Sequence, residues 1–281
     1  MMVLALAVLS TPFCATIAGI VIWASHRHES LDDAALLRNF LFVLILGMML
    51  VWGGSRTDTV RMRLDPQFRI QTEIEANPVY ATVEQYAPDD AKPLREFLGA
   101  QMARGGTLSQ ALLQARPLLT SLANYRLGFT DQESRLSWGR LVADTLKELR
   151  ARDPVLCYRV IAAQTLDQQT LAQAYSVANT EAFQQAVVRI YESADRGMGG
   201  YRLPDEKPAD FNQTALEFRA VMDAIDQQFG HAVAAQIARK KLSEPPAAPP
   251  EQMCAARIFQ LEAMLKRPKA TAALLIDSVL R

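Results

Sequence analysis

The stretch VLALAVLSTPFCATIAGIVIWA, residues 3–24, contains no charged side chain. As an α-helix it is about 33 Å long, which matches the ~30 Å hydrocarbon core of a bilayer. Pro12 lies inside the stretch, and transmembrane helices tolerate a proline. Trp23 lies near its end, where an indole ring favours the membrane–water interface. The pattern predicts a first membrane span over residues 3–24.

A second apolar run, FLFVLILGMMLVWGG at residues 40–54, is too short to cross a bilayer alone. Extended back to residue 34, it reaches the length of about 20 residues that a span needs. Arg38 then lies near one end, where its long side chain can reach the interface, and Trp52 lies near the other. The run predicts a second span over residues 34–54.

The link between the two spans is short and polar, so residues 1–54 are expected to form a transmembrane hairpin with both ends on one side of the membrane. A secretory signal peptide is the alternative for the first run. That run, however, lacks a positive N-terminal region and a clear cleavage site, and its apolar part is too long. We therefore expect an integral membrane protein, and a composition rich in Ala, Leu and Arg suggests a bacterial inner membrane.

The distribution of arginines predicts which side the rest of the chain faces. The link between the spans holds Arg27 and Arg38. The segment after the second span holds more of them, namely Arg56, Arg61, Arg63 and Arg69. Because cytoplasmic segments carry the excess of Lys and Arg, we expect the soluble part in the cytoplasm rather than the periplasm. The side chains expected at the membrane interface are Trp23, Arg38, Trp52, Arg56, Arg61 and Arg63.

The three cysteines show no spacing typical of a zinc or redox site. Cys14 lies in the first span, and Cys157 and Cys254 lie in the soluble part. Two buried free thiols are expected if that part faces a reducing compartment. If it is periplasmic, Cys157 and Cys254 are the pair that would form a disulfide.

Beyond residue 54 no run alternates β-branched or aromatic residues with polar ones over the length of a strand. We therefore predict an all-α protein, in which the hairpin precedes an irregular helical bundle or, as the alternative, an α-solenoid. The expected divisions are a juxtamembrane linker or helix at 55–87, a helical domain at 88–242, a Pro-rich connector at 243–250 and docking helices at 251–281.

Capping residues and apolar stripes predict where single helices start and what they contact. The segment Thr130-Asp131-Gln132-Glu133 has the form of a capping box, and Pro117 suits the first turn of a new helix. Apolar stripes in the last two helices need a partner surface, so we expect these helices to dock onto the domain.

Reactive side chains are sparse. The chain beyond residue 54 has a single histidine, His231, and no H-E-x-x-H or nucleotide-binding glycine motif, so neither cofactor nor catalytic residues are predicted. His26 and His28 lie in the link near acidic residues and are weak candidates for a metal or proton site. A solvated link is the favoured explanation for both histidines.

The charges balance, with 30 Lys plus Arg against 30 Asp plus Glu, which gives no electrostatic reason to bind nucleic acid.

The expected partners are the lipid bilayer and another protein. We therefore interpret the chain as a membrane-anchored interaction or scaffold protein, such as an assembly factor, an envelope or secretion-system component, or a toxin-neutralising partner. The alternatives are a membrane-tethered enzyme with a carboxylate and Arg site, or a membrane-bound sensor that uses the link between the spans.

Overall fold

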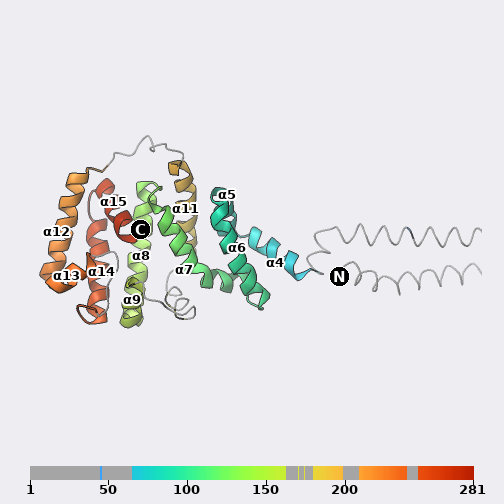
Figure 1. Ribbon diagram of the computed structural model, residues 1–281, viewed down its shortest axis with the longest axis horizontal. Helices are drawn as coiled ribbons and strands as arrows, with labels where there is room; N and C mark the ends of the chain where they lie inside the picture. The colour runs from blue at the N-terminus through green and yellow to red at the C-terminus, as the bar shows by residue number, and fades with distance from the viewer. Residues whose placement is uncertain are drawn as a thin grey trace, which may run out of the picture. The chain divides into compact units, whose positions relative to one another are not determined.

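The computed structural model describes residue 45 and residues 65–162, 170, 174, 180–198, 209–238 and 246–281. In these ranges the regular structure consists of helices, without a strand, and the all-α prediction is confirmed (Figure 1). The chain divides into two compact units, residues 1–73 and residues 74–281.

Both predicted spans, 3–24 and 34–54, lie outside the described residues except for Ile45. The same holds for the candidate residues His26, His28, Trp23, Arg38, Trp52, Arg56, Arg61 and Arg63. Among the helices that the structure does describe, none combines the length and the apolar composition that a membrane crossing requires.

Helix α4 (Pro66–Glu75) and helix α5 (Pro78–Tyr86) start at side-chain caps. The carboxylate of Asp65 accepts the backbone N–H groups of the first turn of α4. The side-chain oxygen of Asn77 accepts those of the first turn of α5, with N···O distances of 3.1 and 3.3 Å. Because the second unit begins at Ile74, α5 belongs to the helical domain.

Helix α6 (Pro88–Ala103) ends before Gly105, whose φ of 92° favours glycine. Helix α7 (Leu108–Leu127) then starts at a capping box between Thr107 and Gln110. Pro117 lies inside α7, so the prediction that it starts a new helix was wrong. The buried face of α7 packs against α6 and α11, and this burial outweighs the helix-breaking effect of one proline.

Helix α8 (Gln132–Arg152) starts at Asp131, whose carboxylate accepts the N–H of Ser134 at 2.6 Å. The predicted capping box at Thr130 is therefore wrong by one residue. The Thr130 hydroxyl instead donates to the carbonyl of Leu127, in the last turn of α7. Helix α9 (Pro154–Ile161) follows α8 directly, and Asp153 caps its first turn.

The remaining helices are α11 (Thr180–Met198), α12 (Phe211–Phe229), α13 (His231–Ile237), α14 (Pro250–Leu265) and α15 (Lys269–Leu280). In Figure 1, α12, α14 and α8 lie side by side, and α15 packs against α8. Helix α11 contacts α5, α7 and α8. The C-terminal helices thus pack in the middle of the bundle.

The main hydrophobic core lies around α14. Five of its side chains have no exposed surface, namely Met253, Cys254, Ala256, Leu261 and Met264. They pack against α8, α9, α12 and α13 in one cluster. The structure pairs Cys254 with Cys157 of α9 in a disulfide, with their Cα atoms 5.9 Å apart. This bond joins α9 to α14 inside the core.

Candidate functional site

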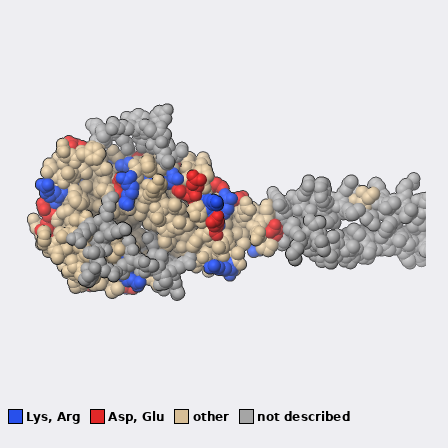
Figure 2. All heavy atoms as spheres, in the orientation of Figure 1, with Lys and Arg blue, Asp and Glu red and all other residues tan. Residues whose placement is uncertain are grey.

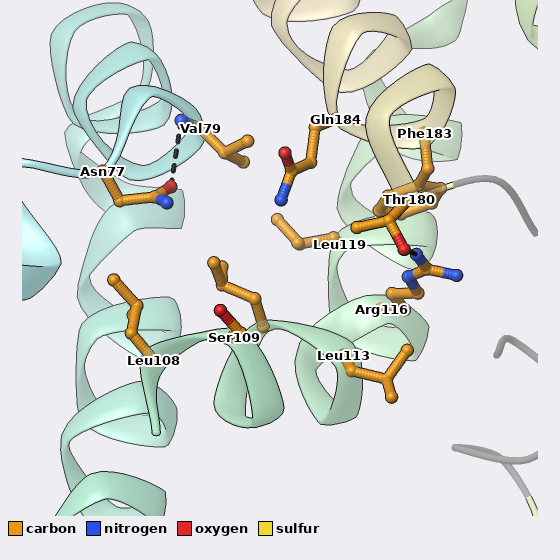
Figure 3. A pocket seen from close by; sticks show the side chains of 11 residues that line it. Asn77, Val79, Leu108, Ser109, Leu113, Arg116, Leu119, Thr180, Phe183 and Gln184 are labelled. Carbon is orange, nitrogen blue, oxygen red and sulfur yellow. Dashed lines mark hydrogen bonds between the residues drawn. The ribbon is translucent and has the colours of Figure 1, made fainter. Parts of the chain in front are cut away.

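Two neighbouring hollows in the helical domain share one wall, the buried ring of Phe183 on α11. We call the first the Arg116 hollow. It has a volume of about 140 Å³ and lies among α5, α7 and α11 (Figure 3). Its lining residues are Asn77, Val79, Leu108, Ser109, Leu112, Leu113, Arg116, Leu119, Thr180, Phe183 and Gln184.

Arg116 lines this hollow and is buried, with 1% of it exposed. Its Nη2 donates to the Thr180 hydroxyl at 2.6 Å, as Figure 3 shows. Its guanidinium carbon lies 5.2 Å from the centre of the Phe183 ring, in cation–π geometry. Burial lowers the pKa of Arg116, but an arginine remains charged at neutral pH.

The size of the Arg116 hollow matches one large apolar side chain. An engineered protein cavity of about 150 Å³ holds a benzene molecule, and this hollow is close to that volume. Leucine, valine and phenylalanine side chains form most of its lining, while Asn77, Ser109, Thr180 and Gln184 add polar groups. A mostly apolar lining with a few polar groups is typical of the pocket that receives an anchor residue at a protein interface.

The second hollow, which we call the Arg257 cleft, is larger, at about 250 Å³. Its walls come from α7, α8, α9, α11, α14 and α15, so it forms only when the C-terminal helices are docked. Its polar lining is Thr120, Asn124, Thr145 and Arg257. Its apolar lining is Trp138, Leu141, Val142, Leu146, Val160, Ile161, Phe183, Leu261, Val279 and Leu280.

Arg257 is the charged residue of this cleft, and 8% of it is exposed. Its Nη1 donates to the side-chain oxygen of Gln260 at 2.5 Å. The amide nitrogen of Gln260 donates in turn to the sulfur of Met222 at 3.6 Å, which fixes the orientation of that amide. Burial lowers the pKa of Arg257 to about 10, so the guanidinium is still a cation at neutral pH. In the described part of the chain its hydrogen-bond partner is thus a neutral amide and not a carboxylate.

Two further polar groups line the Arg257 cleft. The Thr120 hydroxyl oxygen is buried and has no hydrogen-bond partner among the described residues. The indole N–H of Trp138 donates to the side-chain oxygen of Asn124 at 2.8 Å, which leaves the amide nitrogen of Asn124 as a donor. Both groups, like Arg257, can donate hydrogen bonds to an anion or a carbonyl.

The acidic residues of the described chain lie elsewhere. None of them lines either hollow. Asp90 accepts from Nε of Arg126 at 2.5 Å and from the hydroxyl of Tyr191 at 3.0 Å, and this network joins α6, α7 and α11. On the face seen in Figure 2, the acidic and basic side chains of the described residues are interspersed, without a large patch of one sign.

The structure treats the candidates from the sequence differently. It brings Cys157 and Cys254 together, whereas His26 and His28 lie outside the described residues. His231 is exposed at the start of α13, with its Nδ1 3.4 Å from Oδ2 of Asp226. Within the described ranges, no group of three or more His, Cys, Asp or Glu side chains is placed to hold a metal ion.

Sequence reasoning did not identify Arg116 and Arg257, although the sequence carries a signal for both. Each arginine lies at a position of its helix where the pattern of buried apolar residues would place an apolar side chain. Leu112 and Leu119 flank Arg116 at helical spacing, and Met253 and Leu261 flank Arg257 in the same way. A charged residue on such a stripe predicts a buried cation, which is expensive unless it has a partner or a purpose.

Comparison of this chain with known protein families, curated proteins and solved structures finds no match. Function is therefore inferred from the chemistry of the two hollows and from the sequence. Both hollows combine an apolar lining with one buried guanidinium, and that combination is suited to binding.

Proposed function

We propose that the chain is a membrane-anchored interaction protein, whose Arg116 hollow receives an apolar side chain of a protein partner. The hairpin predicted at 3–24 and 34–54 would hold the helical domain at a membrane surface. The observation that carries the proposal is the Arg116 hollow, with its volume of about 140 Å³ and its leucine-rich lining.

The occupant that fits best is one aromatic or branched aliphatic side chain. A ring placed there would contact lining residues such as Leu113 and Leu119. The polar groups around it, such as Ser109 and Gln184, can pair with the backbone of the partner. Protein interfaces concentrate their binding energy in such pockets, and loss of an anchor residue commonly costs 2 kcal/mol or more.

Filling the hollow from within tests the proposal. Ser109 is exposed and lines the hollow, so Ser109→Trp should occupy the space that the partner needs. Ser121 lies on the same helix, is also exposed and does not line the hollow, so Ser121→Trp is the matched control. Cells expressing the full chain are crosslinked in intact membranes, and the products are compared. We expect a crosslinked partner with the unchanged chain and with Ser121→Trp, and its loss with Ser109→Trp.

Equal crosslinking of both variants would contradict the role of the hollow. A full chain that yields no crosslinked partner at all would contradict the interaction proposal itself.

Two signals disagree about the side of the membrane on which the helical domain lies. The arginine distribution favours the cytoplasm, but its margin is small. The buried pair Cys157–Cys254 favours an oxidising space, because disulfides are rare in the cytoplasm. We propose that the helical domain is periplasmic. Topology reporters fused after Arg69 and at Arg281 test this, and cytoplasmic activity of both fusions would overturn it.

The two alternative functions have weaker support. An enzyme with a carboxylate and Arg site needs acidic side chains in a hollow, and the described lining of each hollow offers arginine alone among the charged residues. A sensor that uses His26 and His28 depends on a link outside the described residues. Neither alternative is favoured by a specific contact, and the interaction proposal stands as the principal one.

A further inference from the structure

We propose that the Arg257 cleft is a second, independent binding site, for an aliphatic monocarboxylate with a body of about ten carbon atoms. The carboxylate would pair with the guanidinium of Arg257, and the alkyl chain would lie against the apolar walls. This inference does not depend on a protein partner at the Arg116 hollow.

The charge of the ligand follows from the state of Arg257. A buried guanidinium needs a counter-charge, and removal of an ion from water is otherwise highly unfavourable. Arg257 is more than nine-tenths buried, yet its hydrogen bond goes to the neutral amide of Gln260. No carboxylate of the described residues lines the cleft. A carboxylate ligand there would supply a counter-charge and accept two parallel N–H bonds from the planar guanidinium.

Further polar groups of the cleft suit the same ligand. The Thr120 hydroxyl is buried without a partner among the described residues and can donate to a carboxylate oxygen. Leaving such a buried group unpaired is unfavourable, so a ligand that pairs it is favoured. Neither an amine nor an alcohol satisfies both Arg257 and Thr120, because the cation repels an amine and an alcohol brings no charge.

The apolar body follows from the remaining walls. Most of the lining is Leu, Val and Ile, with the rings of Trp138 and Phe183 at one side. A benzene molecule with six carbons occupies a cavity of about 150 Å³, so a cleft of about 250 Å³ takes about ten carbons in proportion. Octanoate and decanoate have this size.

Calorimetric titration of the full chain in phosphatidylcholine nanodiscs tests the inference, with the heat of empty nanodiscs subtracted. We expect saturable one-site binding of decanoate, weaker binding of butyrate, and no saturable binding of decanol or decylamine. Binding of decanol as tight as that of decanoate would overturn the inference, as would the absence of saturable decanoate binding.

Variants assign the binding to the cleft. Arg257→Met keeps the side-chain length and removes the charge. Arg257 is buried and no carboxylate of the described residues lines its cleft, so its replacement relieves the desolvation of a cation and the fold should persist. We expect decanoate to bind at least tenfold more weakly, as loss of a charge-assisted hydrogen bond predicts. Arg140→Met removes an exposed arginine that does not line the cleft, and it should leave decanoate binding unchanged.

Thr120→Val is the second test, and it is informative even if Arg257→Met does not fold. It removes the unpaired hydroxyl at nearly constant volume, so the domain should be as stable as before or more so. Decanoate should bind several-fold more weakly to it. Unchanged decanoate affinity in both Arg257→Met and Thr120→Val would refute the inference.

Discussion

Gly139 lies where α8 approaches α15 so closely that there is no space for a Cβ atom. It lies inside α8, and a Cβ built there would be 2.9 Å from Cγ2 and 3.0 Å from Cδ1 of Ile276 on α15. Ile276 has no exposed surface and little room to move. We predict that Gly139→Ala lowers the free energy of unfolding by about 1–3 kcal/mol, as overpacking does. Urea unfolding followed by circular dichroism measures it.

Gly99 is the control for this substitution. It lies inside α6, and a Cβ there would meet no atom within 4 Å. Gly99→Ala should therefore raise the free energy of unfolding by about 0.5–1 kcal/mol, through helix propensity alone. If both substitutions stabilise the domain, the close approach of α15 to Gly139 is not present in solution.

Tyr191 predicts how stability changes in alkali. Burial and, next, the Asp90 carboxylate raise the pKa of its hydroxyl well above the ordinary value of 10.0. The folded protein thus keeps a proton that the unfolded chain loses above about pH 10, so stability falls as the pH rises further. Tyr191→Phe lacks this proton and should lose less stability between pH 9 and about 11. Urea unfolding across this range tests it, and parallel curves for the two proteins would contradict the assignment.

Asp153 separates α8 from α9, so its substitution tests how a single cap stabilises a helix. Its carboxylate accepts the N–H of Leu156 at 2.8 Å and so caps α9. Asp153→Ala should lower the free energy of unfolding by about 0.5–2 kcal/mol, the usual effect of a lost N-cap. Asp144→Ala, which removes only an exposed ion pair with Lys147, should change it by less than about 0.5 kcal/mol. A larger loss for Asp144→Ala would contradict this reasoning.

Local signals predicted the all-α class correctly and two helix starts wrongly. A helix cap depends on a few neighbouring residues, as at Asp153 and Thr107 in the structure. Pro117 misled because the penalty for a proline is local, whereas the packing of α7 that outweighs it involves distant residues. Thr130 misled because its hydroxyl had a second acceptor, the carbonyl of Leu127.

The disulfide between Cys157 and Cys254 should stabilise the whole helical domain. Cys157 and Cys254 are 97 residues apart, and the chain-entropy relation gives about 4–5 kcal/mol for a loop of that length. The double variant Cys157→Ala/Cys254→Ala should therefore lower the free energy of unfolding by up to that amount under oxidising conditions. With a strong reductant present throughout, the two proteins should differ far less. An equal difference with and without reductant would show that the cysteines stabilise by packing and not by a bond.

The arrangement of the bundle was less predictable than its helices. The apolar stripe of α14 indicated that it docks, but its pattern does not specify that the partners are α8, α9 and α12. The Arg257 cleft was hidden for the same reason, since Thr120, Trp138 and Arg257 meet only after α14 is in place. Residue spacing predicts which face of one helix is apolar. It does not predict which six helices come together to form a site.

The central position of α14 has a consequence for biosynthesis. The ribosome makes α8 and α9 first and reaches Cys254 after a further 97 residues, which takes about 5–20 s at usual elongation rates. Until then the faces that α14 will cover stay open, and the nascent domain is exposed to chaperones and proteases. A premature stop codon just before α14 would leave a chain with most of the described helices but no closed core. Quality control should therefore degrade such a product.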